Sequence, residues 1–255
     1  MTNKENQSPK TLEGRRPTFF PLDILFEDEA LIAVQKPASM LVIPDRFDAE
    51  KPTVFDAVWY HLCQSEPNKK QEELLPRLVH RLDQGTSGVL LFAKTFAAQR
   101  ALNQDFEQGR VQKCYWAIVV GEVGRDKFVI DKPLGPLKKK KGLMMVDPSG
   151  KESKTEVEVI ERMPVHSLVM AYPKTGRQHQ IRVHLASEGH PLANDPSYRR
   201  APAEEYISAE CPRLTLHARS LTLQHPTTKK SLSIEAPLPK DFNAAILACR
   251  QASKR

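Results

Sequence analysis

Short β-forming segments recur along the chain with few helical segments between them, and this succession limits the fold more than any other feature. Residues 156–161 alternate charged with apolar side chains, as half-buried strands do, and the apolar segment 167–172 is expected to pair with them. Such a succession predicts an α+β fold with a mainly antiparallel mixed sheet, flanked by helices and loops. Further strands are expected at residues 31–34, 89–93, 115–120, 214–216, 221–223 and 232–234.

Three helices are expected from signals at their ends. Residues 53–56 have the spacing of a capping box, with aspartate at the last position, and would open the first helix. A second helix is expected from residue 96 to about residue 108, because the glycine at position 109 is a common helix stop. Residues 175–178 form another capping-box pattern, which predicts a third helix that ends at Gly189.

The length of 255 residues is typical of one large domain. We expect a disordered lead-in over residues 1–18, one domain over residues 19–249 and a basic tail over residues 250–255. No run of about 18 apolar residues occurs, which predicts that no helix crosses a membrane, and residues 1–18 lack the apolar core of a secretory signal. The expected location is therefore the cytoplasm, where the four cysteines would stay reduced.

The net charge of +7 is only weak evidence for a nucleic-acid partner, because much of it lies at the two ends of the chain. One internal segment concentrates positive charge in an expected loop between strands. It consists of Lys138, Lys139, Lys140 and Lys141. Exposed lysine runs are usually just solvated, but where positive charge is concentrated says more than its total.

Asp83 is the strongest candidate for chemistry. It lies in a turn with Gly85 and Gly88, directly before an apolar segment expected to form a strand. Small residues let a backbone approach a ligand closely, and loops held by a rigid strand are a common place for catalytic groups. The local pattern alone favours a structural turn in which Asp83 caps the backbone or pairs with Arg81.

The segment from His80 to Thr95 strongly resembles the signature of the RluA-type pseudouridine synthases: His-Arg-Leu-Asp, two residues, Thr-Ser-Gly, an apolar run and Ala-Lys. Other segments resemble further motifs of that family in the same order, so that the resemblance covers roughly residues 20–240. These are residues 31–38 (an early strand and Lys-Pro turn), 113–121 (Lys-x-Tyr-x-Ala), 175–185 (Gly-Arg-x-His-Gln-Ile-Arg-x-His), and 216–218 with 225–226.

Two positions depart from the family's pattern. Asn194-Asp195 replaces the usual Gly-Asp, although asparagine tolerates the left-handed backbone conformation better than most residues. Gln178 stands where the family often has threonine or serine. No region resembles the small S4 RNA-binding domain that many members of the family carry in front.

The resemblance implies an enzyme that isomerises uridine to pseudouridine in ribosomal RNA, transfer RNA or both, as a monomer without cofactor or metal. It implies that Asp83 is the essential carboxylate, that Arg182 pairs with it, and that Tyr115 stacks on the extracted uracil or relays a proton. Arg81 would displace the target base or hold its former partner. The remaining residues expected to contact substrate or RNA are Thr86, Arg177, His179, Leu216 and the four lysines at 138–141. The histidines of these motifs, His80, His179, His184 and His217, are expected to be hydrogen-bonding groups.

Two other functions stay open at this point. One is a non-catalytic RNA-binding or RNA-folding factor on the same domain, which the presence of Asp83, Tyr115 and Arg182 disfavours. The other is an RNA hydrolase that uses Asp83 as a base, which the lack of a second carboxylate and of metal-ligand spacing disfavours.

Overall fold

The fold is a large curved sheet with helices on both faces. The computed structural model describes residues 16–44, 51–198 and 213–252. Within this part the strands are β1 (Asp23–Glu27), β2 (Leu31–Lys36), β3 (Arg77–Leu78), β4 (Ser87–Ala93), β5 (Gln112–Val120), β6 (Lys127–Asp131), β9 (Lys154–Arg162), β10 (His166–Pro173), β11 (Leu216–Gln224) and β12 (Ser231–Glu235). Their order is β1-β2-β4-β11-β5-β10-β9-β6, with β12 beside β11 and β3 beside β4.

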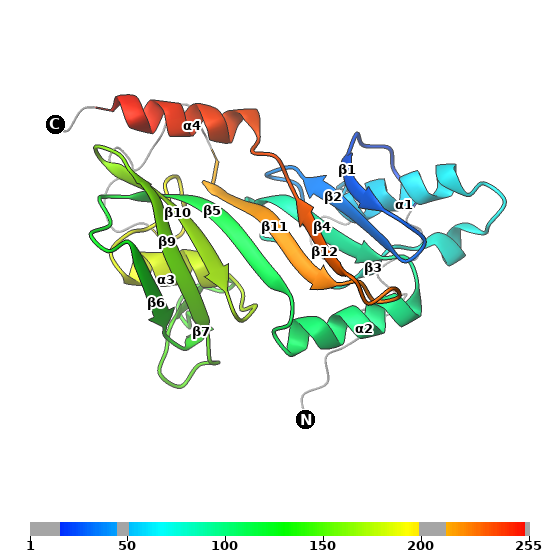
Figure 1. The fold of residues 1–255 in the computed structure, drawn as a ribbon, viewed down its shortest axis with the longest axis horizontal. Helices are drawn as coiled ribbons and strands as arrows, with labels where there is room; N and C mark the ends of the chain where they lie inside the picture. Colours follow the sequence, from blue (N-terminus) through cyan, green and yellow to red (C-terminus); the bar gives the residue numbers. More distant parts are fainter. Residues whose placement is uncertain (1–15, 45–50, 199–212, 253–255) are drawn as a thin grey trace.

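The sheet is mainly antiparallel, as the sequence predicts. Among the described pairs, only β4 and β11 run parallel. Strand β11 crosses the middle of the molecule, with β1, β2 and β4 on one side of it and β5, β10, β9 and β6 on the other (Figure 1). Together with four helices this confirms the α+β class.

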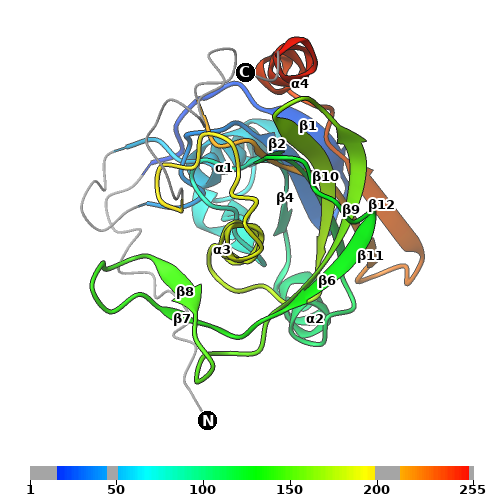
Figure 2. The same ribbon diagram turned by 90° about the vertical axis from the view of Figure 1, so that its left-hand side faces the viewer.

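The helices cover the two faces of the sheet in pairs. They are α1 (Val54–Ser65), α2 (Phe96–Glu107), α3 (Gln180–Ser187) and α4 (Lys240–Gln251). Alternate residues of β2 separate the faces, since Ile32 packs with the α1 side and Leu31 with the α2 side. In β5, Ala117 packs with α3 and Ile118 with α4. Helices α1 and α3 share one face, because Tyr115 contacts both of their clusters, and Figure 2 shows α3 inside the curve of the sheet.

Two of the expected helix signals are confirmed. Thr53 caps α1 with a full capping box: its hydroxyl accepts from the Asp56 N–H, and the Asp56 carboxylate accepts from the Thr53 N–H. Thr95 caps α2, and Gly109 follows the helix with φ +68°. Both signals depend on residues only a few positions apart, so the sequence alone is enough to predict them.

The third helix is present and Gly189 follows it with φ +92°, but the predicted capping box at its start is wrong. Helix α3 begins at Gln180, and its N-cap residue is His179, which has φ +54° and whose side chain makes no capping hydrogen bond. The Thr175 hydroxyl instead donates to the side-chain oxygen of Gln180 at 2.7 Å, and the Arg177 N–H donates to the same oxygen at 3.0 Å. The Gln180 N–H donates to the Arg177 carbonyl at 3.2 Å, so that residues 177–180 form a turn and the helix starts later than predicted.

The C-terminal region also differs from the expectation. The two short strands expected at 214–216 and 221–223 form one strand, β11, with a register shift between Ala218 and Ser220. Helix α4 was not predicted. Its Arg250 was placed in a basic tail, but it lies in the helix and donates to Glu161 at 2.8 and 2.7 Å.

A separate hairpin, β7 (Leu134–Pro136) and β8 (Met144–Val146), stands apart from the main sheet. The four lysines at 138–141 are exposed in its turn, which confirms the predicted loop between strands. In Figure 2 the hairpin projects on the side of the sheet that carries α3.

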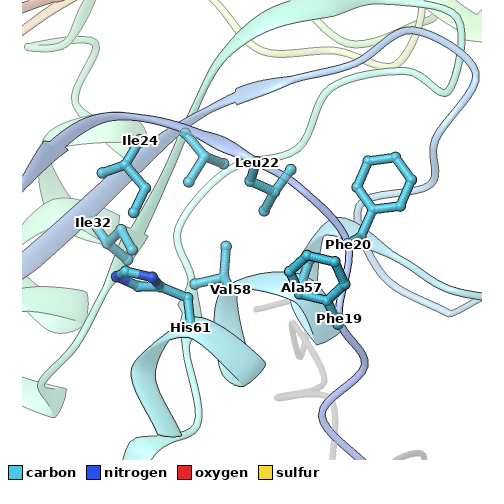
Figure 3. Close-up of a pocket in the computed structure, with 9 residues that line it drawn as sticks. Phe19, Phe20, Leu22, Ile24, Ile32, Ala57, Val58 and His61 are labelled. Atoms are coloured by element: carbon cyan, nitrogen blue, oxygen red, sulfur yellow. The ribbon is translucent and has the colours of Figure 1, made fainter. Parts of the chain in front are cut away.

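A small apolar pocket of about 80 Å³ lies between the N-terminal strands and α1, lined by Phe19, Leu22, Ile32 and Val58 among others (Figure 3). None of the residues proposed from the sequence lines it, so it has no part in the site described below. No helix in the described ranges combines the length and apolar character needed to span a membrane.

Candidate active site

Asp83 lies in the loop between β3 and β4, where β4 meets β11. The Thr86 N–H donates to the Asp83 carbonyl at 3.0 Å and closes a tight turn. Gly88 has φ +116°, and a Cβ at this position would lie 2.2 Å from the Ala218 carbonyl oxygen. Only glycine lets the two backbones approach so closely. The turn that carries Asp83 is thereby held against β11.

Lys36, the last residue of β2, supports this turn from beneath. Its side chain is fully buried, and its ammonium group donates to the carbonyls of Pro37 (2.8 Å), Gln84 (3.0 Å) and Thr86 (2.8 Å). These acceptors use all three protons of an ammonium group. Burial lowers the pKa of Lys36 to about 7. Lys36 therefore ties β2 to the loop on the C-terminal side of Asp83.

Arg182, from α3, lies between two carboxylates. Its Nε and Nη2 donate to Asp195 at 2.8 and 2.9 Å, and its Nη1 donates to Asp83 Oδ2 at 3.3 Å. The side chain of Asp195 is fully buried and that of Arg182 is 8% exposed, whereas that of Asp83 is 26% exposed. Burial opposes the charge of Arg182, but hydrogen bonding and attraction from Asp195, then from Asp83, raise its pKa. Asp195 thus holds the Arg182 guanidinium beside Asp83, the carboxylate that is accessible to solvent.

Tyr115 and Leu216 form an apolar side to this centre. Tyr115 packs against the clusters of both α1 and α3. Burial first, and then the negative charge of Asp83, raises the pKa of Tyr115 above its usual value, so its phenol stays protonated at neutral pH. Leu216 pairs with Ala117 of β5 and is 3% exposed. The site therefore combines an accessible carboxylate, a fixed cation and a protonated phenol.

His179 and Tyr198 lie on the α3 side of Asp83. His179 Nε2 is 3.9 Å from Asp83 Oδ2, and its Nδ1 is 2.6 Å from the Tyr198 hydroxyl. The Tyr198 hydroxyl accepts from the Met144 N–H of β8 at 2.9 Å. The guanidinium carbon of Arg182 is 5.0 Å from the centre of the Tyr198 ring.

The other residues expected to bind RNA are placed differently. Arg81 and Arg177 are exposed, and Arg177 Nε donates to the Glu152 carbonyl at 3.0 Å. Thr86 is buried, with 1% exposed, and it contributes to the Asp83 turn through its backbone N–H. The lysines at 138–141 are exposed on the β7–β8 hairpin. Their contacts with RNA stay predictions.

The motif histidines make hydrogen bonds, as expected. His80 accepts from a backbone N–H of β4 at 3.0 Å, and burial lowers its pKa to about 3. His184 contacts the Thr155 hydroxyl at 2.8 Å, and His217 contacts the Ser87 hydroxyl at 2.9 Å. In the described part of the chain, no three histidine, cysteine, aspartate or glutamate side chains form a group that could hold a metal.

Three members of the centre were not predicted as site residues: Lys36, Asp195 and Tyr198. Lys36 belongs to the Lys-Pro turn and Asp195 to the Asn-Asp pair, so both lie in recognised motifs, but the motifs do not show which residues they contact. Asn194 has φ +58°, which confirms that asparagine can take the left-handed position usually held by glycine. Tyr198 carried no local signal, since its contacts lie 19 and 54 residues away.

Comparison with known proteins identifies this combination of fold and site. Residues 30–187 match the family model described as RNA pseudouridylate synthase. The chain belongs to this family, which is a family of isomerases that act on RNA.

Two curated relatives illustrate the similarity. The ribosomal large subunit pseudouridine synthase D of Nitrosomonas europaea is 40% identical over 235 residues, which are 90% of this chain and 66% of that protein. The ribosomal large subunit pseudouridine synthase C of Vibrio vulnificus is 34% identical over 255 residues, 95% of this chain and 77% of that one. The chain thus spans about two thirds to three quarters of these relatives.

Solved structures share the fold. Human RNA pseudouridylate synthase domain containing 1 has a TM-score of 0.70 at 25% identity, covering 91% of this chain and 96% of its own. Human RNA pseudouridylate synthase domain containing 4 has a TM-score of 0.73 at 24% identity, covering 89% and 93% respectively.

Replacing Asp195 with asparagine should lower the free energy of unfolding by about 3–5 kcal/mol, because the buried Arg182 loses its charged partner. Urea denaturation measures this loss. Asp126→Asn is the matched control: Asp126 is 84% exposed and lies 2.6 Å from Arg162, so its change should cost no more than about 1 kcal/mol. Equal losses in the two variants would contradict the role given to Asp195.

Replacing Lys36 with methionine should lower the free energy of unfolding by about 3 kcal/mol or more, because buried carbonyls lose their donor. The deficit should grow as the pH rises above 7. The unfolded chain keeps the Lys36 proton up to about pH 10.5, whereas the folded protein releases it near pH 7, so the folded state gains relative stability in that window. Urea denaturation of wild type and Lys36→Met at pH 6 and pH 9 measures both effects.

Lys127→Met is the control for this experiment, since Lys127 is 72% exposed in its pair with Glu158. It should change the stability by less than about 1 kcal/mol at either pH. A Lys36→Met deficit that shrinks from pH 6 to pH 9 would show that the ammonium form is the favoured buried form.

Proposed function

We propose that the chain isomerises uridine to pseudouridine in ribosomal RNA of the large subunit, with Asp83 as the essential carboxylate. The observation that carries the assignment of Asp83 is its position: it is the accessible acid of the buried Arg182 centre, at 3.3 Å from Nη1. The sequence left transfer RNA open as a substrate. Relatives named for ribosomal large subunit synthases favour ribosomal RNA.

The reaction breaks the N1–C1′ bond of uridine, turns the uracil and joins C5 to C1′. Substrate and product are isomers, so the balanced reaction needs no donor of atoms or electrons. A stacked or paired uridine must first be extracted from the RNA into the site. A carboxylate can then attack C1′ or C6, or assist departure of the uracil by a glycal route. All three routes need a negatively charged Asp83, and a nearby cation favours that form.

Tyr115 is proposed to act as a neutral phenol. Because its pKa is raised, it would offer a ring for stacking and a proton for hydrogen bonding, and a phenolate base at this position is disfavoured. Leu216 would form the apolar wall beneath the uracil. Arg81, which is exposed near the turn, would occupy the space that the extracted base leaves in the RNA.

The remaining expectations follow as part of the proposal. We propose a monomer, acting in the cytoplasm on structured RNA, in which the β7–β8 hairpin binds phosphates through its lysines. The rival function, a non-catalytic RNA-binding factor, would leave the Asp83–Arg182 pair without a purpose at a solvent-accessible place.

Asp83→Ala and Asp83→Asn should abolish isomerisation. Large-subunit RNA from cells that lack the protein should lack one or a few pseudouridines, and wild type should restore them while both Asp83 variants do not. Chemical mapping of pseudouridine measures this outcome. Asp105→Asn, a change at an ion pair of α2, is the control and should restore the modification fully. An unchanged map in cells without the protein would contradict the proposed activity.

Replacing the four lysines at 138–141 with serine should weaken RNA binding and reduce its salt dependence. Each phosphate contact contributes a slope of about 0.9 log units of affinity per log unit of salt on a duplex. Fluorescence anisotropy with an RNA fragment at several salt concentrations measures the slope. Replacing Lys229 and Lys230, in the β11–β12 turn, tests a second pair of exposed lysines and should leave the slope unchanged. If the hairpin variant keeps the salt slope of wild type, the hairpin lysines are merely solvated.

A further inference from the structure

Tyr198 is a half-buried polar group whose contacts the proposed reaction does not yet explain. It follows the Asn194-Asp195 turn and lies against three parts of the molecule: the β8 backbone, the N-terminus of α3 and the guanidinium of Arg182. The inference below rests on the proposed function and concerns how this tyrosine serves the same site.

The hydrogen bonds of Tyr198 have a defined direction. The Met144 N–H can only donate, so the Tyr198 oxygen accepts that bond at 2.9 Å. Burial raises the pKa of Tyr198, so the hydroxyl keeps its own proton. Among the described residues, His179 Nδ1, at 2.6 Å, is the acceptor that the structure gives to this proton.

This direction determines the state of the His179 ring. Burial lowers the pKa of His179, which favours a neutral imidazole. A neutral imidazole that accepts at Nδ1 carries its proton on Nε2. Nε2 lies 3.9 Å from Asp83 Oδ2, so the N–H faces the accessible carboxylate and the space beside it. That separation exceeds a direct hydrogen bond, which leaves the donor available to an oxygen of the substrate.

The β7–β8 hairpin holds His179 from two sides. Met144, the first residue of β8, fixes Tyr198, and the Gly142 carbonyl accepts from Gln178 Nε2 at 3.1 Å. Gln178 directly precedes His179, and the lysine run directly precedes Gly142. The β7–β8 hairpin is thus hydrogen-bonded both to Gln178, which precedes the histidine in the chain, and to Tyr198, which contacts the histidine ring.

We propose that Tyr198 is a positioning residue: its hydroxyl links the β7–β8 hairpin to His179 and holds the histidine with its proton on Nε2, directed at Asp83 and the bound uridine. His179 has a left-handed φ of +54°, a backbone conformation that persists only where the surrounding structure holds it. Docking of RNA phosphates on the hairpin would therefore also set the orientation of a donor at the reacting base.

Tyr198→Phe is the test variant, because it removes the hydroxyl and keeps the ring on Arg182. On an RNA fragment that contains the mapped uridine, kcat should fall by up to about 100-fold with little change in KM, as expected when a reacting group is misplaced. Tyr60→Phe, which removes a hydroxyl on α1 and keeps the ring contact with Phe19, should match wild type. Thermal denaturation checks that both variants are folded.

A double-variant cycle separates positioning from simple loss of structure. If Tyr198 acts through His179, then Tyr198→Phe should have no further effect on kcat in a His179→Ala background. Additive losses would overturn the proposal, as would a Tyr198→Phe variant with the kcat of wild type.

Nitrogen-15 NMR of histidine-labelled protein reads the tautomer directly. Wild type should show His179, assigned by comparison with His179→Ala, with the proton on Nε2. Tyr198→Phe should show a shift toward the Nδ1 tautomer or a mixture of the two. A proton on Nδ1 in wild type, or an unchanged ring in the variant, would overturn the inference. This measurement needs no activity, so it decides about Tyr198 even if wild type proves unable to modify RNA, which would instead contradict the proposed function.

Discussion

The positive charge of Arg182 is almost fully buried, and its two carboxylate partners, Asp195 and Asp83, bind it unequally. Asp195 takes two hydrogen bonds and has no exposed surface, whereas Asp83 takes one longer bond and keeps contact with solvent. The cost of burying a guanidinium is offset mainly by Asp195. Asp83 can therefore interact with a substrate, because the buried charge of Arg182 does not depend on Asp83 alone for a partner.

The rest of the site is built around this inequality. Lys36 secures the turn of Asp83 from the β2 side, and Gly88 lets the same turn meet β11. On the other side, Tyr198 and His179 attach α3 to the β7–β8 hairpin. One buried cation, Arg182, thus lies beside one accessible acid, and the buried Lys36 amine supports the turn that carries this acid. A nucleophilic or charge-stabilising carboxylate requires such an environment, since positive charge that is fixed in advance needs no rearrangement during the reaction.

Local signals in the sequence predicted what local interactions decide. The capping box at Thr53 and the glycine stop at position 109 are satisfied within a few residues, and both were found where expected. The pattern at 175–178 failed because the Thr175 hydroxyl has other partners: it accepts from the Lys154 N–H and donates to the Gln180 side chain. The family motifs placed Asp83, Tyr115 and Arg182 in one site, and the structure brings them together. Two of the three acceptors of Lys36 lie 48 and 50 residues away, and the partners of Tyr198 lie 19 and 54 residues away, so no local pattern could have shown them.

The position of β11 has a consequence for how the protein is made. This strand follows both β4 and β5 in the chain, with β6 to β10 and α3 before it, yet it lies between β4 and β5 in the sheet. Asp83 belongs to the half of the sheet that ends at β4, and Tyr115 belongs to the half that begins at β5. A nascent chain that stops before residue 216 already contains Asp83, Tyr115 and Arg182, but it has no strand to join the halves that carry them. The two halves of the active centre are therefore joined only when residues 216–224 take their place between β4 and β5.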